Sequence, residues 1–184
     1  MDALVAVVAE KGFESASLEA VAERAESTLA GFHRHFGDKE DGCARAVGEL
    51  CDRFDRHLLP VYLRPEPWRL RIRAAALTAA AYLSEHPEQV AFAIGEHARR
   101  GRLPQAEPSL GLHLEEIDAV RSELPEPGAP PPSAAEFCVG TFLELVIRNH
   151  RQGSIDGLEA AVPGLLYVVY DVYLGAEVAE EEMD

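Results

Sequence analysis

The chain has 184 residues, of which 47% are hydrophobic, and a formal net charge of −15. This length is sufficient for a well-buried core in one or two domains. Residues 1–58 hold seven Lys and Arg against twelve Asp and Glu. Tight nonspecific binding to nucleic acid depends on neutralising phosphates, so the composition argues against it. A local basic face made from Arg34, Lys39 and Arg45 remains compatible with this balance.

The first part of the chain predicts three helices in close succession. An apolar periodic run ends at Gly12, a residue suited to the position just past a helix. Ser17 stands where a helix N-cap belongs. The residues behind it have one apolar stripe at helical spacing: Leu18, Val21, Ala22 and Ala25. Thr28 can then cap a short helix, Leu29–Phe36, whose Phe32 and Phe36 lie one turn apart and face inward.

The other residues of Leu29–Phe36 are expected to face solvent or a DNA groove: Leu29, Gly31, His33 and Arg34. Gly37 ends this helix, and Asp38 caps the next with Asp41 in a capping-box position. Two short helices joined by a tight turn and followed by a longer one are the layout of a helix-turn-helix DNA reader. The alternative is a helical bundle that binds no nucleic acid, because the same arrangement also packs short helices around a shared core.

The rest of the chain also predicts helices, and we expect an all-α fold. Further helices are expected over residues 68–86, 87–100, 110–123, 134–150 and 163–174, with a proline-rich loop at 124–133 and a frayed acidic tail at 177–184. Pro60 and the Pro65–Pro67 segment interrupt the helical pattern. We therefore expect a three-helix DNA-binding domain at 1–58 and a larger helical domain for ligand binding and dimerisation at 59–184.

Ala134–His150 and Pro163–Leu174 are apolar over most of their circumference. Helices of this kind must be covered on more than one side, and in a small chain a second copy is the natural cover. The alternative is that both are central core helices. The expected interface residues of a homodimer are Phe142, Val146, Leu165, Val169 and Val172.

No catalytic or phosphate-binding motif is found, and His33 and His35 do not share a helix face, so we expect no enzyme, cofactor or metal. An apolar pocket is expected within residues 68–147, with Phe92, His97 and Phe142 as candidate contacts to a small, largely hydrophobic effector. A lone histidine on an apolar helix is more often a core residue.

With no signal peptide and no 18-residue apolar run, we expect a cytoplasmic protein without a membrane partner.

The segment Gly12–Gly42 resembles the N-terminal domain of the TetR (tetracycline-repressor) family of transcriptional regulators. The residues that carry the resemblance are Gly12, Phe13, Ser17, Leu18, Val21, Ala22, Ala25, Thr28, Arg34, His35, Phe36 and Lys39. A looser match covers Ser84–Glu88 and the segment from Leu165 to Gly175.

The resemblance implies a ligand-responsive repressor that binds operator DNA as a homodimer. The dimer would use a four-helix bundle made from the last two helices of each subunit. The implied DNA-binding residues are Ser17, Thr28, Leu29, Gly31, His33, Arg34 and Lys39. Among them Lys39 and His33 are expected at phosphates, and Thr28, Leu29 and Arg34 nearest the base edges.

Five positions depart from the family pattern. Glu26 replaces the usual Gly of the turn, Leu29 a usual Lys or Arg, Ala30-Gly31 the habitual Gly-Thr pair, and His33 the usual Tyr. These changes remove phosphate donors or add negative charge. They define an alternative function: a degenerate relative that has lost DNA binding and acts as a small-molecule or protein interaction module.

Overall fold

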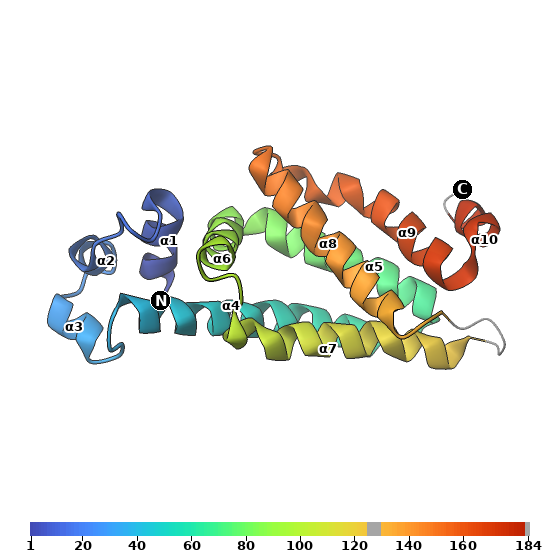
Figure 1. Ribbon diagram of the computed structural model, residues 1–184, viewed down its shortest axis with the longest axis horizontal. Coiled ribbons are helices and arrows are strands. Elements are labelled where there is room, and N and C mark those ends of the chain that lie inside the picture. The colour runs from blue at the N-terminus through green and yellow to red at the C-terminus, as the bar shows by residue number, and fades with distance from the viewer. Residues whose placement is uncertain (125–129, 183–184) are drawn as a thin grey trace. The chain divides into compact units, whose positions relative to one another are not determined.

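The computed structural model describes residues 1–124 and 130–182, and within these ranges the regular structure is helical, with no strand. The expected all-α fold is confirmed (Figure 1). The α-helices are α1 (Asp2–Lys11), α2 (Leu18–Arg24), α3 (Leu29–His33), α4 (Lys39–Tyr62), α5 (Trp68–Glu85), α6 (Pro87–Arg100), α7 (Glu107–Asp118), α8 (Ser133–Arg151), α9 (Val162–Leu174) and α10 (Ala176–Glu181). Three short 3-10 helices are η1 (Pro104–Ala106), η2 (Ala119–Glu123) and η3 (Ile155–Ala161).

The chain divides into two compact units. The first comprises Met1–Arg53 with His86–Pro108, and the second comprises Phe54–Glu85 with the described residues from Ser109 onward. Helix α6 therefore belongs with the N-terminal helices, and it packs against α1. The functional boundary expected at residues 58/59 stays a prediction.

The three predicted N-caps are confirmed. Ser17 Oγ accepts a hydrogen bond from Ala20 N at 3.1 Å, and Thr28 Oγ1 accepts one from Gly31 N at 3.0 Å. Asp38 Oδ1 accepts one from Asp41 N at 2.8 Å, while the Asp41 carboxylate accepts one from Gly37 N at 3.0 Å. Each cap satisfies an N–H group that the first turn of a helix leaves without a partner, so each helix begins where its capping residue stands.

Several expected boundaries need correction. Helix α3 ends at His33 and not at Phe36, although Phe36 N still donates to Phe32 O at 3.0 Å in the turn that follows. Helix α4 continues through Pro60 to Tyr62, although a proline has no backbone N–H and therefore removes one hydrogen bond from the end of the helix.

The expectation of a frayed C-terminal tail is also wrong, because Ala176–Glu181 forms helix α10 and Ala179 is fully buried. Residues 183–184 of that tail lie outside the described residues. The proline-rich loop expected at 124–133 also lies in part outside them, over residues 125–129.

In the first unit, two cations lie over the ring of Phe13, in the loop between α1 and α2. Lys39 Nζ is 4.3 Å from the ring centroid, and Arg99 Cζ is 3.7 Å from it. The Lys39 ammonium also donates hydrogen bonds to the carbonyl oxygens of Phe13, at 2.6 Å, and Ala16, at 2.8 Å. Because Lys39 opens α4 and Arg99 lies near the end of α6, Phe13 joins three parts of the unit.

Two carboxylates share the arginines at the end of α6. Glu40 in the first turn of α4 accepts hydrogen bonds from Arg99, at 2.8 and 2.9 Å, and from Arg100, at 2.6 Å. The carboxylate of Glu96 is buried and bonds both arginines, the shortest contact being 2.9 Å. The hydrogen bond from Arg99 is the main cause that lowers the pKa of Glu40. Glu96 is thus a paired buried charge, the form in which such charges are tolerated.

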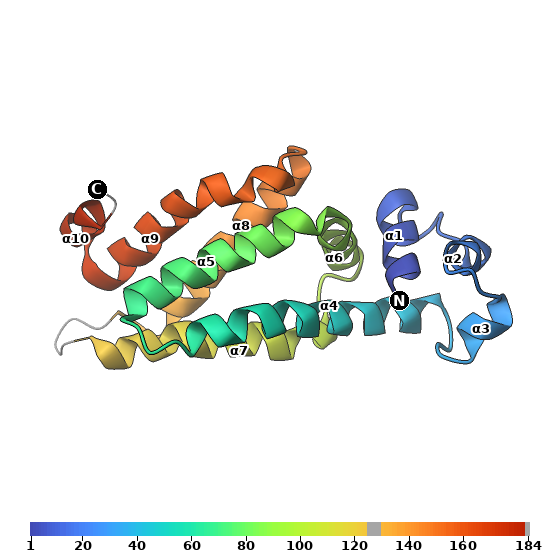
Figure 2. The ribbon, with the colours of Figure 1, turned by 180° about the vertical axis from the view of Figure 1, so that it is seen from behind.

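The core of the second unit lies between α5, η3, α8 and α9. Figure 2 shows α5 running beside η3 and α9, which contact it in the structure. The Trp68 ring lies 6.0 Å from those of Tyr170 and Tyr173, and Tyr170 Oη donates to Arg69 O at 3.2 Å. By length and composition Ile155–Leu174 is apolar enough to cross a membrane, but many of its side chains belong to this core, among them Leu158, Leu165, Leu166, Val169 and Tyr170.

Replacing Lys39 with Met should destabilise the protein by about 2 kcal/mol, because it removes two charge-assisted hydrogen bonds to backbone carbonyls. Urea denaturation measures the change. The control is Lys11→Met, since Lys11 is exposed in the last turn of α1 and its replacement should cost well under about 1 kcal/mol. Equal effects of the two substitutions would contradict the structural role of Lys39.

Candidate nucleic-acid interface

Helices α2 and α3 are joined by a tight turn that places one residue in the left-handed region. Glu26 has φ 49°, a conformation that glycine adopts without cost and that other residues adopt with strain. The turn is closed by hydrogen bonds from Glu26 N to Glu23 O, at 3.1 Å, and from Ser27 N to Ala22 O, at 2.9 Å. A glutamate therefore occupies the place where the family pattern has glycine, and the backbone keeps the glycine-like conformation.

Helix α3 presents an exposed face of mixed character. Leu29 is 37% exposed, and His33, Arg34 and the following His35 are exposed as well. The inner side of the helix carries Phe32, which is buried and whose ring centroid lies 4.9 Å from that of Phe36. Leu29, His33 and Arg34 thus lie on an accessible face, as the sequence predicts.

Gly31 differs from that expectation, because it is buried and not exposed. A Cβ atom at this position would come within 2.5 Å of Ser27 Oγ in the turn. The absence of a side chain at Gly31 therefore lets α3 pack closely on the turn.

Most cations near α3 are already engaged within the unit. Lys39 donates to the carbonyls of Phe13 and Ala16, Arg45 pairs with Asp41 at 3.0 Å, and Arg24 pairs with Glu10 at 2.8 Å. Arg34, in contrast, forms no ion pair with any residue that the structure describes. The hydrogen bond from Gly37 and the contact with Arg45 lower the pKa of Asp41, so this carboxylate stays charged beside α3.

The expected effector contacts fall in different units. Phe92 is 1% exposed and belongs to the hydrophobic core of the first unit, whereas His97 is exposed on the same helix. Phe142 is half-buried on α8 in the second unit. Neither unit alone holds all three residues, and their role in ligand binding stays a prediction.

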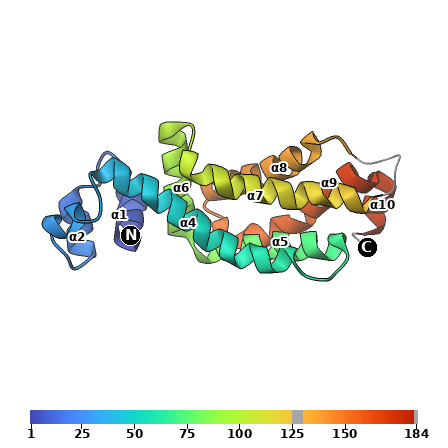
Figure 3. The ribbon, with the colours of Figure 1, turned by 90° about the horizontal axis from the view of Figure 1, so that it is seen from below.

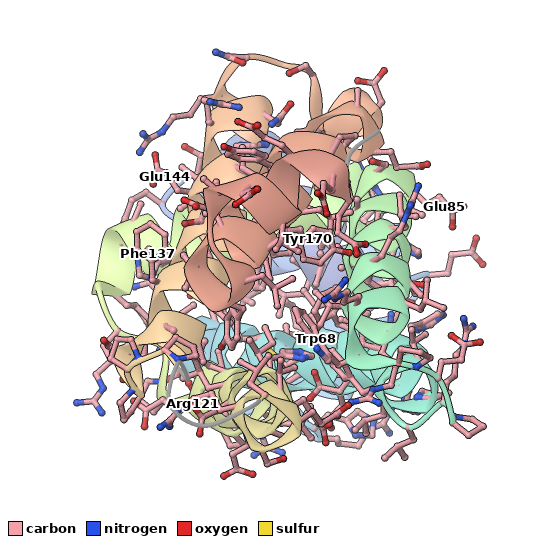
Figure 4. All side chains as sticks on the ribbon, turned by 90° about the vertical axis from the view of Figure 1, so that its right-hand side faces the viewer. Trp68, Glu85, Arg121, Phe137, Glu144 and Tyr170 are labelled. Atoms are coloured by element: carbon pink, nitrogen blue, oxygen red, sulfur yellow. The ribbon has the colours of Figure 1, made fainter. Side chains whose placement is uncertain are left out.

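The expected dimer residues face mainly inward. Val146, Leu165 and Val169 are buried within the second unit, and Phe142 and Val172 are half-buried. The outer side of α8 carries Phe137, 57% exposed, together with Glu144; Figure 4 shows both pointing away from the unit, whereas Trp68 and Tyr170 point inward. Two open hollows lie on α8 and at the junction of α8 and α9, and Thr141, Leu145 and Arg148 line both.

A polar cluster in the second unit was not predicted from the sequence. Asp55 of α4 lies against Ser109 and His113 of α7, with Ser109 Oγ donating to Asp55 Oδ1 at 2.6 Å. One signal could have pointed to Asp55: it falls at helical spacing in the apolar stripe of α4, between Cys51 and the buried Leu58. The partner residues on α7 carry no comparable signal.

Residues 1–41 match the family described as bacterial regulatory proteins, tetR family. The match covers α1, α2, α3 and the first residues of α4. A comparison with curated proteins gives no match. Members of this family are transcriptional regulators. Residues 1–41 therefore match the DNA-binding domain of the tetR family of transcription regulators.

Proposed function

We propose that this protein is a repressor that binds operator DNA as a homodimer and releases it when a small, largely hydrophobic effector binds. The observation that carries DNA recognition is the exposed face of α3, where Leu29, His33 and Arg34 are accessible and Arg34 has no ion pair among the described residues. Helices of this type read base edges in the major groove, and the two copies of a dimer read half-sites one DNA turn apart.

Within that proposal the exposed residues have different roles. Arg34 can donate two hydrogen bonds to a guanine, and Leu29 can contact a thymine methyl group. Thr28 lies beside them at the start of α3, and we assign phosphate contacts to His33 and Ser17, following the family pattern. Lys39 donates to two backbone carbonyls, and its third N–H is left for the phosphate contact that the resemblance implies. It positions α4 against the α1–α2 loop.

The dimer contact that we propose uses the outer side of α8 with the adjoining part of α9. Phe137 is exposed there, and Gly140 and Gly164 line the hollows without side chains of their own. In a two-fold contact each pair occurs twice. An antiparallel crossing of two α8 helices near Phe142 brings Glu136 opposite Arg148 of the partner subunit, six residues to either side. The charges on this face are therefore self-complementary.

The alternative is an interaction module that no longer binds DNA. Three observations favour it: the negatively charged Glu26 in the turn, the internal engagement of Lys39, and the ion pair that occupies Arg45. Selection of bound genomic fragments by the full-length protein separates the two functions. Enrichment of a two-fold symmetric sequence supports the repressor, whereas no enrichment at low salt supports the interaction module.

Replacing Arg34 with Ala should weaken binding to the selected operator by about 1–3 kcal/mol and weaken binding to random DNA much less, because the lost contact reads a base. The matched control is Arg24→Ala, which removes an exposed arginine already paired with Glu10. Fluorescence anisotropy at fixed salt measures both. A uniform loss on all sequences would make Arg34 a phosphate contact.

Replacing Phe137 with Glu should weaken dimerisation at least about 100-fold, since an exposed aromatic side chain that is buried in an interface is a typical energetic anchor. The control is Leu63→Glu, because Leu63 is 73% exposed at the end of α4 and lies outside the proposed interface. Sedimentation at micromolar concentration gives the subunit state. A monomeric unmodified protein would overturn the proposed dimer.

Two substitutions of Glu26 separate strain from charge. Glu26→Gly should stabilise the protein by about 0.5–1 kcal/mol because glycine adopts a positive φ freely, whereas Glu26→Gln keeps the strain and should leave stability nearly unchanged. Both remove one negative charge and should tighten DNA binding to a similar extent. Thermal unfolding and operator titration measure the two effects. Equal stability of the two variants would show that the turn is not strained.

A further inference from the structure

The second unit contains a polar cluster that the proposed DNA binding does not use. Asp55 Oδ1 accepts a hydrogen bond from Ser109 Oγ at 2.6 Å and lies 3.0 Å from His113 Nε2. On the other side of the imidazole ring, Tyr62 Oη lies 3.4 Å from His113 Nδ1. The cluster thus joins α4 to α7, which Figure 3 shows side by side along the later half of α4.

Aromatic rings enclose the cluster on the side of α4 and α5. The His113 ring packs edge-on against Phe54 at 5.4 Å and tilted against Tyr62 at 5.9 Å. Phe54 in turn contacts Tyr82 of α5 at 5.6 Å, and the His57 ring contacts Tyr82 at 4.7 Å. The side chain of His113 is only 11% exposed, and that of Asp55 only 16%. An imidazole in these surroundings is largely removed from water.

The contact between His113 and Asp55 is close but poorly aligned. Nε2 lies at 3.0 Å from the carboxylate oxygen, yet this buried nitrogen has no partner with hydrogen-bond geometry. A protonated ring would therefore gain the attraction of Asp55 without a well-directed hydrogen bond. At the same time Nδ1 would become a donor, so its contact with Tyr62 could persist only with the hydroxyl oxygen as acceptor.

We propose that the contact between α4 and α7 is an acid-sensitive latch, held closed by neutral His113 and loosened when this ring takes up a proton. The groups that face the ring are Asp55 and Tyr62 from α4 and Glu116 from α7, and the His57–Tyr82 ring pair lies beyond Phe54. Asp55 and Glu116 favour the protonated form, while burial among rings opposes it. The proposal concerns the second unit alone and is independent of DNA binding.

The balance between these effects favours the neutral ring. Burial is the largest influence on His113 and lowers its pKa below the ordinary 6.5, although Asp55 and Glu116 act in the opposite direction. The unfolded chain therefore binds a proton more readily than the folded one. Stability that depends on neutral His113 is fully present above about pH 6.5, and it is lost as pH falls through the lowered folded value.

Hydrogen exchange of the α7 backbone, corrected for the pH dependence of intrinsic exchange, tests the latch in the full-length protein. Between pH 7.5 and 5 the opening of α7 in the unmodified protein should increase by up to about tenfold per pH unit, the limit for uptake of one proton. His113→Gln cannot titrate in this range and should flatten the profile. The control is His97→Gln, since His97 is exposed on α6 in the other unit and should leave the α7 profile unchanged.

A second variant keeps the test decisive if His113→Gln folds poorly. Asp55→Asn removes the attraction for the proton and lowers the folded pKa of His113 further, so the loss of α7 protection should still begin near the ordinary 6.5 and should continue to a lower pH. Loss of the acid response in Asp55→Asn would assign the titration to Asp55 and overturn the proposal. Protection of α7 that increases as the pH falls in the unmodified protein would also overturn it, because the ion pair would then outweigh burial.

Discussion

The geometry of the DNA-binding domain depends on the Phe13 ring and the two cations that lie over it. Phe13 belongs to the loop between α1 and α2, Lys39 begins α4, and Arg99 lies near the end of α6. The same Lys39 ammonium binds the carbonyl oxygens of Phe13 and Ala16, so ring and backbone are held by one group. Because Ala16 directly precedes the N-cap of α2, this contact fixes where α2 begins relative to α4. The orientation of α3 follows from both neighbours, since it is joined to α2 by the tight turn and supported by Phe32 and Phe36.

This arrangement has an electrostatic consequence. The first unit uses its cations to hold its own helices together: Arg99 and Arg100 bind Glu40 and Glu96, and Arg53 binds Asp2 at 2.8 Å. A protein of net charge −15 that engages its cations internally has few left to neutralise phosphates. The proposed DNA recognition would therefore depend more on base contacts than on backbone contacts, and its affinity would vary less steeply with salt.

The sequence predicted those features that arise from neighbouring residues. The caps at Ser17, Thr28 and Asp38 involve partners three residues away, and the pattern of small polar residues before apolar runs identifies them. It could not predict contacts between distant positions. Lys39 and Phe13 are 26 residues apart, so the hydrogen bonds of the Lys39 ammonium to the α1–α2 loop leave no local pattern in the sequence, while its role at phosphates stays a prediction. Asp55 and Ser109 are 54 residues apart, and the cluster around His113 leaves no local pattern in the sequence.

Helix α8 is apolar on two sides, one that packs in the core and one that is exposed. Its inner side, with Ala135, Cys138 and Val146, belongs to the core of the second unit, while Phe137 and Leu143 remain 57% and 47% exposed. A core helix and the proposed interface helix are therefore compatible alternatives, because different residues would serve each purpose. Charge on Val169 or Val146 would disturb the fold of one subunit first, and only residues such as Phe137 can report on association alone. Helical periodicity indicates how many sides of a helix are apolar. Which of these sides is available to a second copy depends on which of them the other helices of the same chain already cover.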